Sequence, residues 1–262
     1  MRPDRADSIA RPPPGDYDVH MEFSAEDLFD AVDRLVMSSL SHVGIREAPV
    51  DTLRVASEGF HLRIEYAEPE DPHERQYGDR PRRRASADTV LLRDDMTEES
   101  QHLLAARAVA RRLLPQVLAK LGVNHETENR QANAQLVNMI APRLLLPTRW
   151  FAGDAARAGY DLFRLKEKYT TAGMEMMALR MLDLDDPCLI AIVDDDGTIV
   201  NRRSNRFQAP RKLTEAEMTC RELIQESGEP AQAKGSGWIV RGWPTPGVPF
   251  RRIVMRSVPE DV

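Results

Sequence analysis

The sequence predicts an α+β fold, with a helix-rich first part and a small β-sheet module near the C-terminus. Residues 101–151 contain two stretches whose apolar residues recur at three- and four-residue steps, as they do on one face of a helix. Residues 188–203 contain two β-rich runs joined by Asp-Asp-Asp-Gly, in which Asp-Gly is a strong signal for a hairpin turn. We therefore expect a disordered arm at 1–20, a first domain at 21–185 and a C-terminal α+β module at 186–262.

Composition limits the class of protein. The chain has 262 residues, of which 42% are hydrophobic, so it can bury the core of one compact domain with an appendage or of two small domains. Its net charge of -6 gives no general attraction to nucleic acid or to acidic membranes. No apolar run reaches the roughly eighteen residues of a membrane span. Cys188 and Cys220 have no metal-type spacing, and the chain starts with a charged, proline-rich stretch, so we expect a cytoplasmic protein.

Local signals place the elements of the first part in order. Ser24 is the expected N-cap of a first helix, and Asp51 is the expected cap of a second, short helix. Residues 60–66 alternate like a strand, and residues 89–93 are β-rich, so both are predicted strands. The polar stretch 67–88 between them has no periodic pattern and is predicted to be a mobile loop.

The two long helices follow. Thr97 is the expected N-cap of the first, because Glu98 and Glu99 then form an acidic first turn. Pro115 and Pro142 lie inside the two helices, and each is expected to kink or end its helix, since proline removes a backbone hydrogen bond. The predicted apolar faces comprise Ala106, Ala110, Leu113, Val117 and Leu121 in the first helix, and Leu136, Ile140 and Leu144 in the second.

The second of these helices carries the most specific pattern in the chain. Its anchors are Asn138, Ala141, Leu144, Leu145 and Pro147, spaced as N-x-x-A-x-x-L-L-x-P. In this it resembles the ImmA/IrrE family of zinc metallopeptidase-like proteins, and the resemblance covers roughly residues 25 to 200. It implies a zincin-like core, a small sheet with helices, of the kind found in peptidases that cut a transcriptional repressor.

The chemistry that the family motif carries is missing from this sequence. Aligning the first helix with A-H-E-x-x-H through Ala105 puts Ala106 and Ala110 at two metal-ligand positions, Arg107 at the general-base position, and Ala134 at the third ligand. Zinc needs three donors from His, Cys, Asp or Glu, and alanine offers none. Arginine cannot act as a base at neutral pH. The resemblance therefore implies a non-catalytic regulatory homologue without zinc or another cofactor, whose partner is a protein, with a transcriptional repressor as the class that the family suggests.

Two alternatives remain open. An active metallo-endopeptidase could use a relocated site built from the nearest donors, which are His102, His125, Glu126 and Glu128. The simpler interpretation of His102 is a surface pair with Glu98 or Glu99 on the same helix face. A DNA-binding regulator could instead use a helix-turn-helix-like pair at 161–182. The methionines of that pair favour core packing, and the negative net charge opposes nucleic acid as a partner.

The C-terminal module combines strands with one helix. Thr214 and Glu217 form a capping-box pattern that predicts a helix over 213–227. Residues 235–243 and 250–258 alternate like strands and are expected to pair with the hairpin at 188–203. A basic connector precedes the helix and is the candidate contact for an acidic or phosphate group, with a solvated loop as the simpler alternative. Its basic residues are Arg202, Arg203, Arg206, Arg211 and Lys212.

Overall fold

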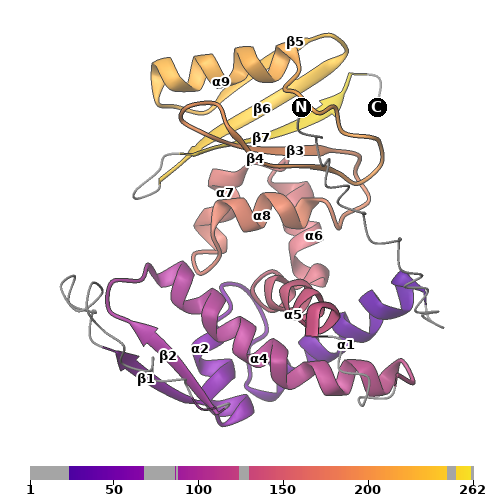
Figure 1. Cartoon of the computed structure of the whole chain (residues 1–262), viewed down its shortest axis with the longest axis vertical. Helices are drawn as coiled ribbons and strands as arrows, with labels where there is room; N and C mark the ends of the chain where they lie inside the picture. Colours follow the sequence, from indigo (N-terminus) through magenta and orange to yellow (C-terminus); the bar gives the residue numbers. More distant parts are fainter. Residues whose placement is uncertain (1–23, 68–85, 87, 124–129, 247–251, 261–262) are drawn as a thin grey trace, which may run out of the picture.

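The computed structural model describes residues 24–67, 86, 88–123, 130–246 and 252–260, and within them the chain is an α+β protein. A helical part and a five-stranded antiparallel sheet lie one above the other, and a single helix covers the outer face of the sheet (Figure 1). The α+β class predicted from the sequence is confirmed. The arm predicted at 1–20 lies outside the described residues, as does most of the predicted loop at 67–88.

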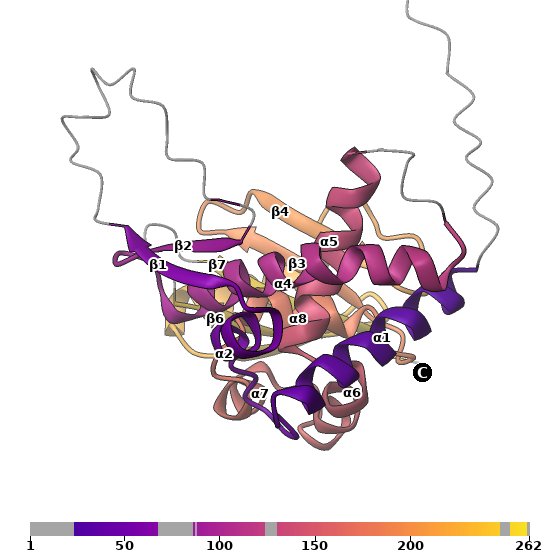
Figure 2. The ribbon, with the colours of Figure 1, turned by 90° about the horizontal axis from the view of Figure 1, so that it is seen from below.

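The helical part begins with the elements that local signals predict. Helix α1 (Ala25–His42) starts with a capping box between Ser24 and Asp27. Asp51 accepts a hydrogen bond from the backbone of Arg54 and caps α2 (Thr52–Arg54), which continues as the π-helical turn η1 (Val55–Gly59). Strands β1 (Arg63–Ala67) and β2 (Thr89–Arg93) pair in parallel and lie beside α4 (Figure 2).

Helices α4 (Glu98–Lys120) and α5 (Arg130–Leu145) form the centre of this part. Thr97 caps α4 as predicted. Pro115 was expected to kink or end the helix. It does not end it, because α4 continues to Lys120. Pro115 and Arg111, whose carbonyl loses its hydrogen bond, are both exposed, so water can solvate that carbonyl while the opposite face of the helix stays packed. Pro142 is likewise inside α5, which continues to Leu145.

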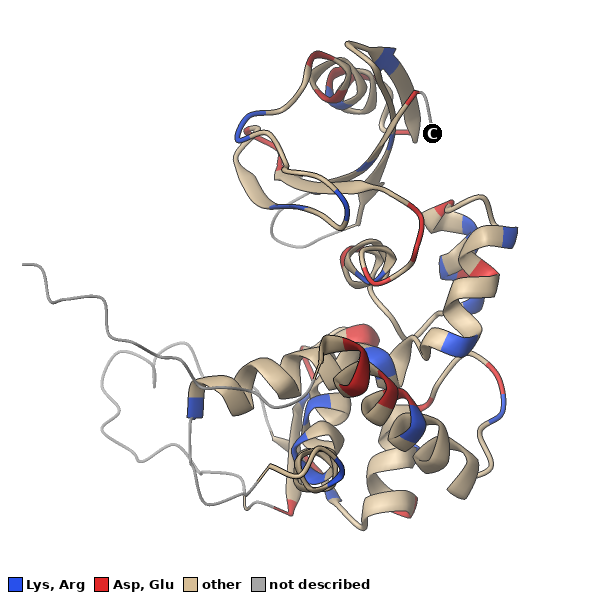
Figure 3. Cartoon of the chain, turned by 90° about the vertical axis from the view of Figure 1, so that its right-hand side faces the viewer, with Lys and Arg blue, Asp and Glu red and all other residues tan. Residues whose placement is uncertain are grey.

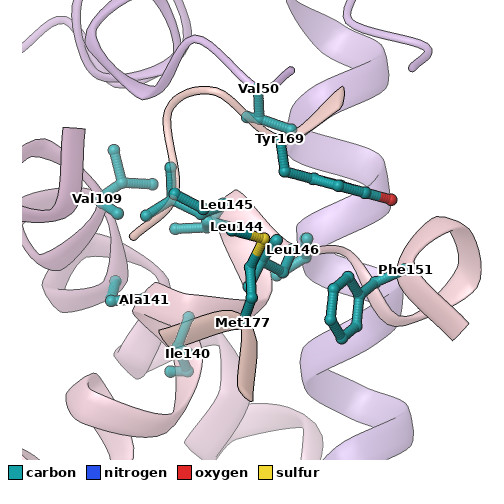
Figure 4. Packing of buried hydrophobic residues seen from close by; sticks show 14 of the residues in the cluster. Val50, Val109, Ile140, Ala141, Leu144, Leu145, Leu146, Phe151, Tyr169 and Met177 are labelled. Carbon is teal, nitrogen blue, oxygen red and sulfur yellow. The ribbon is translucent and has the colours of Figure 1, made fainter. Parts of the chain in front are cut away.

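Three shorter helices join this centre to the sheet: α6 (Thr148–Arg157), α7 (Leu162–Lys168) and α8 (Met174–Met181). The predicted break between the last two is confirmed at 169–173. Phe151 and Tyr169 meet edge to face in the core, and Met177 of α8 lies beside Leu146 (Figure 4). The core packing predicted for the methionines is confirmed, since Met174, Met177 and Met181 are all buried.

The C-terminal sheet has the strand order β4-β3-β7-β6-β5. The strands are β3 (Leu189–Asp194), β4 (Ile199–Ser204), β5 (Ala231–Gly235), β6 (Trp238–Thr245) and β7 (Arg252–Pro259). The predicted pairing of the tail with the hairpin is confirmed by the antiparallel contact of β7 with β3. Helix α9 (Glu215–Ser227) starts with the predicted capping box between Thr214 and Glu217. The edge strand β5 was not predicted.

Both faces of the sheet are covered. Leu189, Ala191 and Val193 of β3 pack under α9, whereas Ile190 and Ile192 of the same strand belong to the core of the helical part. Helix α9 approaches the sheet closely at Gly242, where an added Cβ would lie 2.6 Å from Ile224 Cδ1. The sheet and the helical part therefore share one hydrophobic core, and the domain boundary at 185/186 stays a prediction.

Candidate functional site

A groove lies where the helical part meets the sheet, and we call it the central groove. It has a volume of about 1210 Å³ and is lined by residues of α4, α5, α7, α8, β4 and the β6–β7 end of the sheet. On α4 its lining residues include Leu103 and Arg107, four positions apart, and on α5 they include Asn138 and Met139. The groove thus lies along the pair of helices that carries the family-like pattern.

The four positions at which the alignment places metal ligands and a base do not share one surface. Ala106 and Ala110 are fully buried in the hydrophobic core. Arg107 is exposed and lines the central groove, and Ala134 is exposed in the first turns of α5. The α4 residues that line the groove are Glu99, Ser100, Leu103 and Arg107, so the pairs with the i, i+4 spacing of a histidine pair are Glu99–Leu103 and Leu103–Arg107. Leu103 and Arg107 cannot donate an electron pair to zinc, and the carboxylate of Glu99 is bound to Lys166.

His102 is held inside the protein and does not lie on its surface. It is only 5% exposed, its Nδ1 lies 3.1 Å from Thr52 Oγ1, and its carbonyl accepts a hydrogen bond of 2.7 Å from that hydroxyl. The predicted proximity to Glu98 exists, at 3.8 Å from Nε2, but the expected surface pair is wrong because the imidazole is buried. The other donors of a relocated site, His125, Glu126 and Glu128, lie outside the described residues. Within the described part, no group of three or more His, Cys, Asp and Glu is placed to hold a metal.

The environment of His102 predicts a pH-dependent stability. Burial lowers its pKa from 6.5, against the opposing effects of Asp51 and Glu98. The folded state therefore binds the proton less readily than the unfolded state, and the stabilising contribution is complete above pH 6.5 and is lost as the pH falls through the lower folded pKa. We expect the free energy of unfolding, measured with urea between pH 8 and pH 5, to decrease below pH 6.5. His102→Gln should flatten this slope, whereas the same change at exposed His42 should leave it unchanged.

A network of buried charge joins α1, α5, α6 and α8 at one wall of the groove. Arg143 and Arg180 are 4% and 3% exposed, and both bind the carboxylate of Asp183, Arg143 through Nη2 at 3.1 Å. Arg180 also donates to Leu146 O and to Thr148 Oγ1, and Thr148 in turn donates to Asp33 at 3.0 Å. Burial, followed by the neighbouring Arg143, lowers the pKa of Arg180 to about 10 despite Asp183 and Asp33.

Two more cations of the groove wall are engaged in links between elements. Lys166 of α7 binds Glu99 of α4 and also donates to the carbonyls of Thr170 and Ala172. Arg252 of β7 donates to Asp194 at 2.8 Å and to Glu175 of α8 at 3.2 Å. These links fix the groove walls relative to one another.

The basic residues predicted as a contact region are not brought together. The side chain of Arg202 is buried and binds Glu217 of α9 with both terminal nitrogens, at 2.7 and 2.8 Å. Arg206 is exposed near Asp185 at 3.5 Å, and Arg211 and Lys212 are exposed in the connector. Of the five, Arg203 lines the central groove. Sequence reasoning missed the Arg202–Glu217 pair, because a capping-box glutamate gives no signal of a second partner fifteen residues away in the chain.

Helix α8 does not present the side chains that a DNA-reading helix needs. Its basic residue, Arg180, is buried and bonded within the protein, and three of its methionines, Met174, Met177 and Met181, are buried in the core. Basic and acidic residues are interspersed over the helical part in the view of Figure 3. None of the described helices is both long enough and apolar enough to cross a membrane.

Comparison with known proteins finds a similarity in structure and none in sequence family. No family model matches the chain. No curated protein matches it either. Among solved structures, it is similar to a Mycobacterium tuberculosis transcriptional regulator, with a TM-score of 0.59 over 89% of this chain and 80% of that one. The two sequences are 14% identical, so the likeness shows a shared fold.

Proposed function

We propose that this chain is a non-catalytic regulatory protein of the ImmA/IrrE kind, which binds a protein partner and does not hydrolyse it. The observation that carries the proposal is that neither i, i+4 pair of α4 residues in the central groove, Glu99–Leu103 or Leu103–Arg107, offers two metal donors. A zincin needs two metal donors at such positions and a carboxylate beside them to take a proton from the bound water.

The electrostatics of the groove support the same proposal. An arginine at the wall of the groove repels a dication, and its guanidinium stays protonated at neutral pH. The alternative register, with Ala106 and Ala110 as ligand positions, is no better for metal binding, because both methyl groups are buried among core residues. His102, the described donor of a relocated site, is held by Thr52 in a buried position between α2 and α4.

The regulatory part of the proposal draws on the structural neighbour, which is titled a transcriptional regulator. A chain with this fold and without hydrolytic groups could act in transcription by binding a repressor or a similar factor. Direct reading of DNA by α7 and α8 is disfavoured, since Arg180 is buried in the network with Asp183.

Metal loading tests the non-catalytic part. The purified, untagged chain is incubated with one equivalent of zinc, dialysed, and analysed for bound metal, with His102→Ala treated in parallel. We expect much less than one equivalent to remain on either protein. One tightly held equivalent on the wild-type chain would overturn the proposal, and its loss in His102→Ala would assign the metal to a relocated site.

A further inference from the structure

The central groove is more basic than the chain that contains it. Six basic and four acidic residues line the groove, whereas the whole chain has a net charge of -6. The basic residues are Arg107, Arg143, Lys166, Arg180, Arg203 and Arg252, and the acidic residues are Glu99, Glu167, Glu175 and Asp183. An acidic protein that concentrates positive charge in one concave surface favours anionic ligands there.

Four of the six cations are already neutralised by groove residues. Lys166 binds Glu99, Arg252 binds Glu175, and the two buried arginines share Asp183. These four hold the walls together: Lys166 and Arg252 cannot turn to a ligand without giving up their contacts with Glu99 and Glu175, and Arg143 and Arg180 are buried. They are therefore structural, although they contribute to the positive potential.

Arg107 and Arg203 differ from the other four. Both are exposed, and among the described residues neither side chain has a hydrogen bond or an ion pair to a protein group. Arg107 comes from α4 of the helical part and Arg203 from β4 of the sheet, so they belong to two separate elements of the groove wall. A guanidinium offers two parallel N–H donors that match a carboxylate, and both forks are free for a ligand.

The surface between the charged residues is apolar and adaptable. It includes Leu103, Met139, Phe163, Met176 and Leu179, and Phe163 is 39% exposed. Methionine side chains are flexible and polarisable, and surfaces rich in them adjust to different apolar groups. The groove therefore combines free cations with an apolar lining.

We propose that the central groove binds an extended acidic segment of a partner protein, with Arg107 and Arg203 each holding a carboxylate and with an apolar side chain of the segment on the methionine-lined surface. The inference rests on the proposed function and specifies the chemistry of the partner. A volume of about 1210 Å³ exceeds the roughly 300–1,000 Å³ of small-molecule pockets, so the groove suits a peptide better than a single small anion.

Selection from a displayed library of random peptides tests this inference with the full chain. Peptides of about ten residues span about 33 Å when extended, which suits a test for an extended segment. We expect the selected peptides to be enriched in Asp and Glu around an apolar residue, and the binding of a dye-labelled selected peptide to weaken about tenfold or more with each of Arg107→Met and Arg203→Met. Because both side chains are exposed and unpaired among the described residues, these variants should unfold at the wild-type temperature.

The control variant Arg211→Met/Lys212→Met removes two cations from the connector, outside the residues that line the groove, and should retain peptide binding within about twofold. Failure to enrich acidic peptides would overturn the inference, as would peptide binding that Arg107→Met/Arg203→Met leaves intact. Pyrophosphate that bound through the same arginines more tightly than any selected peptide would identify a small anion as the occupant and would also overturn it. None of these outcomes depends on whether zinc binds, so the inference and the non-catalytic proposal can fail separately.

Discussion

Replacing Arg202 by methionine is expected to lower the free energy of unfolding by about 3–5 kcal/mol. The side chains of Arg202 and Glu217 are 5% and 0% exposed, and the two-pronged contact between them joins β4 to α9. Without the guanidinium, Glu217 would keep a buried charge, and of the described residues only Thr214 and Ser257 would donate hydrogen bonds to it. Chemical denaturation followed by tryptophan fluorescence measures the loss, since Trp238 and Trp243 lie in the same sheet.

A second substitution distinguishes an unpaired charge from lost packing. Glu217→Gln should destabilise the wild-type chain, because it leaves Arg202 buried without its counter-charge, yet it should stabilise the Arg202→Met variant by removing the stranded carboxylate. The neighbouring Arg203→Met is the matched control and should change stability by less than about 0.5 kcal/mol, because its side chain is exposed. If Arg202→Met were no more destabilising than this control, the pair would not be buried in solution.

The parts of the fold that the sequence predicts are those with local causes. Ser24, Asp51, Thr97 and Thr214 each cap the helix that they were expected to cap, because an N-cap needs only a side-chain oxygen close to the next backbone amides. The Asp-Gly turn likewise predicts the β3–β4 hairpin, in which Gly197 has a φ of +88°.

The parts that were missed depend on distant partners. Strand β5, Ala-Gln-Ala-Lys-Gly, has no β-branched residue, and it is a strand because β6 pairs with it and α9 packs beside it. Pro115 was expected to kink or end its helix, but α4 continues past it to Lys120, with its buried face packed in the core. Tertiary contacts override local propensity in both cases.

The candidate site was predictable only in outline. The sequence predicted the helices that line the central groove. It also singled out two residues of the groove, but separately: Arg107 as the degenerate base position and Arg203 as part of the basic connector. It could not show that Arg202 points into an ion pair while its neighbour Arg203 lines the groove, although alternation along a strand makes such a division natural. A basic side chain is available to a ligand only if no carboxylate of the protein binds it. The carboxylates that bind these residues come from other helices and strands, which the local sequence does not reveal.

The second large effect is expected at Asp183, where Asn in place of Asp should cost about 3 kcal/mol of stability. Asp183 binds both Arg143 and Arg180, which are nearly inaccessible to water, and its loss would leave Asp33 as the nearest carboxylate for two buried guanidinium groups. Removing one partner of a buried ion pair leaves an uncompensated charge, and the cost lies at the lower end of the usual range because the Asp183 side chain is itself 30% exposed.

Asp185→Asn provides the matched control, because Asp185 lies two residues further on, is fully exposed and approaches Arg206 only to 3.5 Å. A solvated ion pair contributes between zero and about 1 kcal/mol, so Asp185→Asn should have little effect. The free energies of unfolding of the two variants, measured with heat and with urea, should therefore differ by most of the loss expected for Asp183→Asn. Equal stabilities would mean that water reaches the two arginines, and the network would then not fix α8 against α5 and α6. A loss of stability in Asp183→Asn alone would instead mean that the Asp183 carboxylate holds this groove wall together, because both buried arginines contact it.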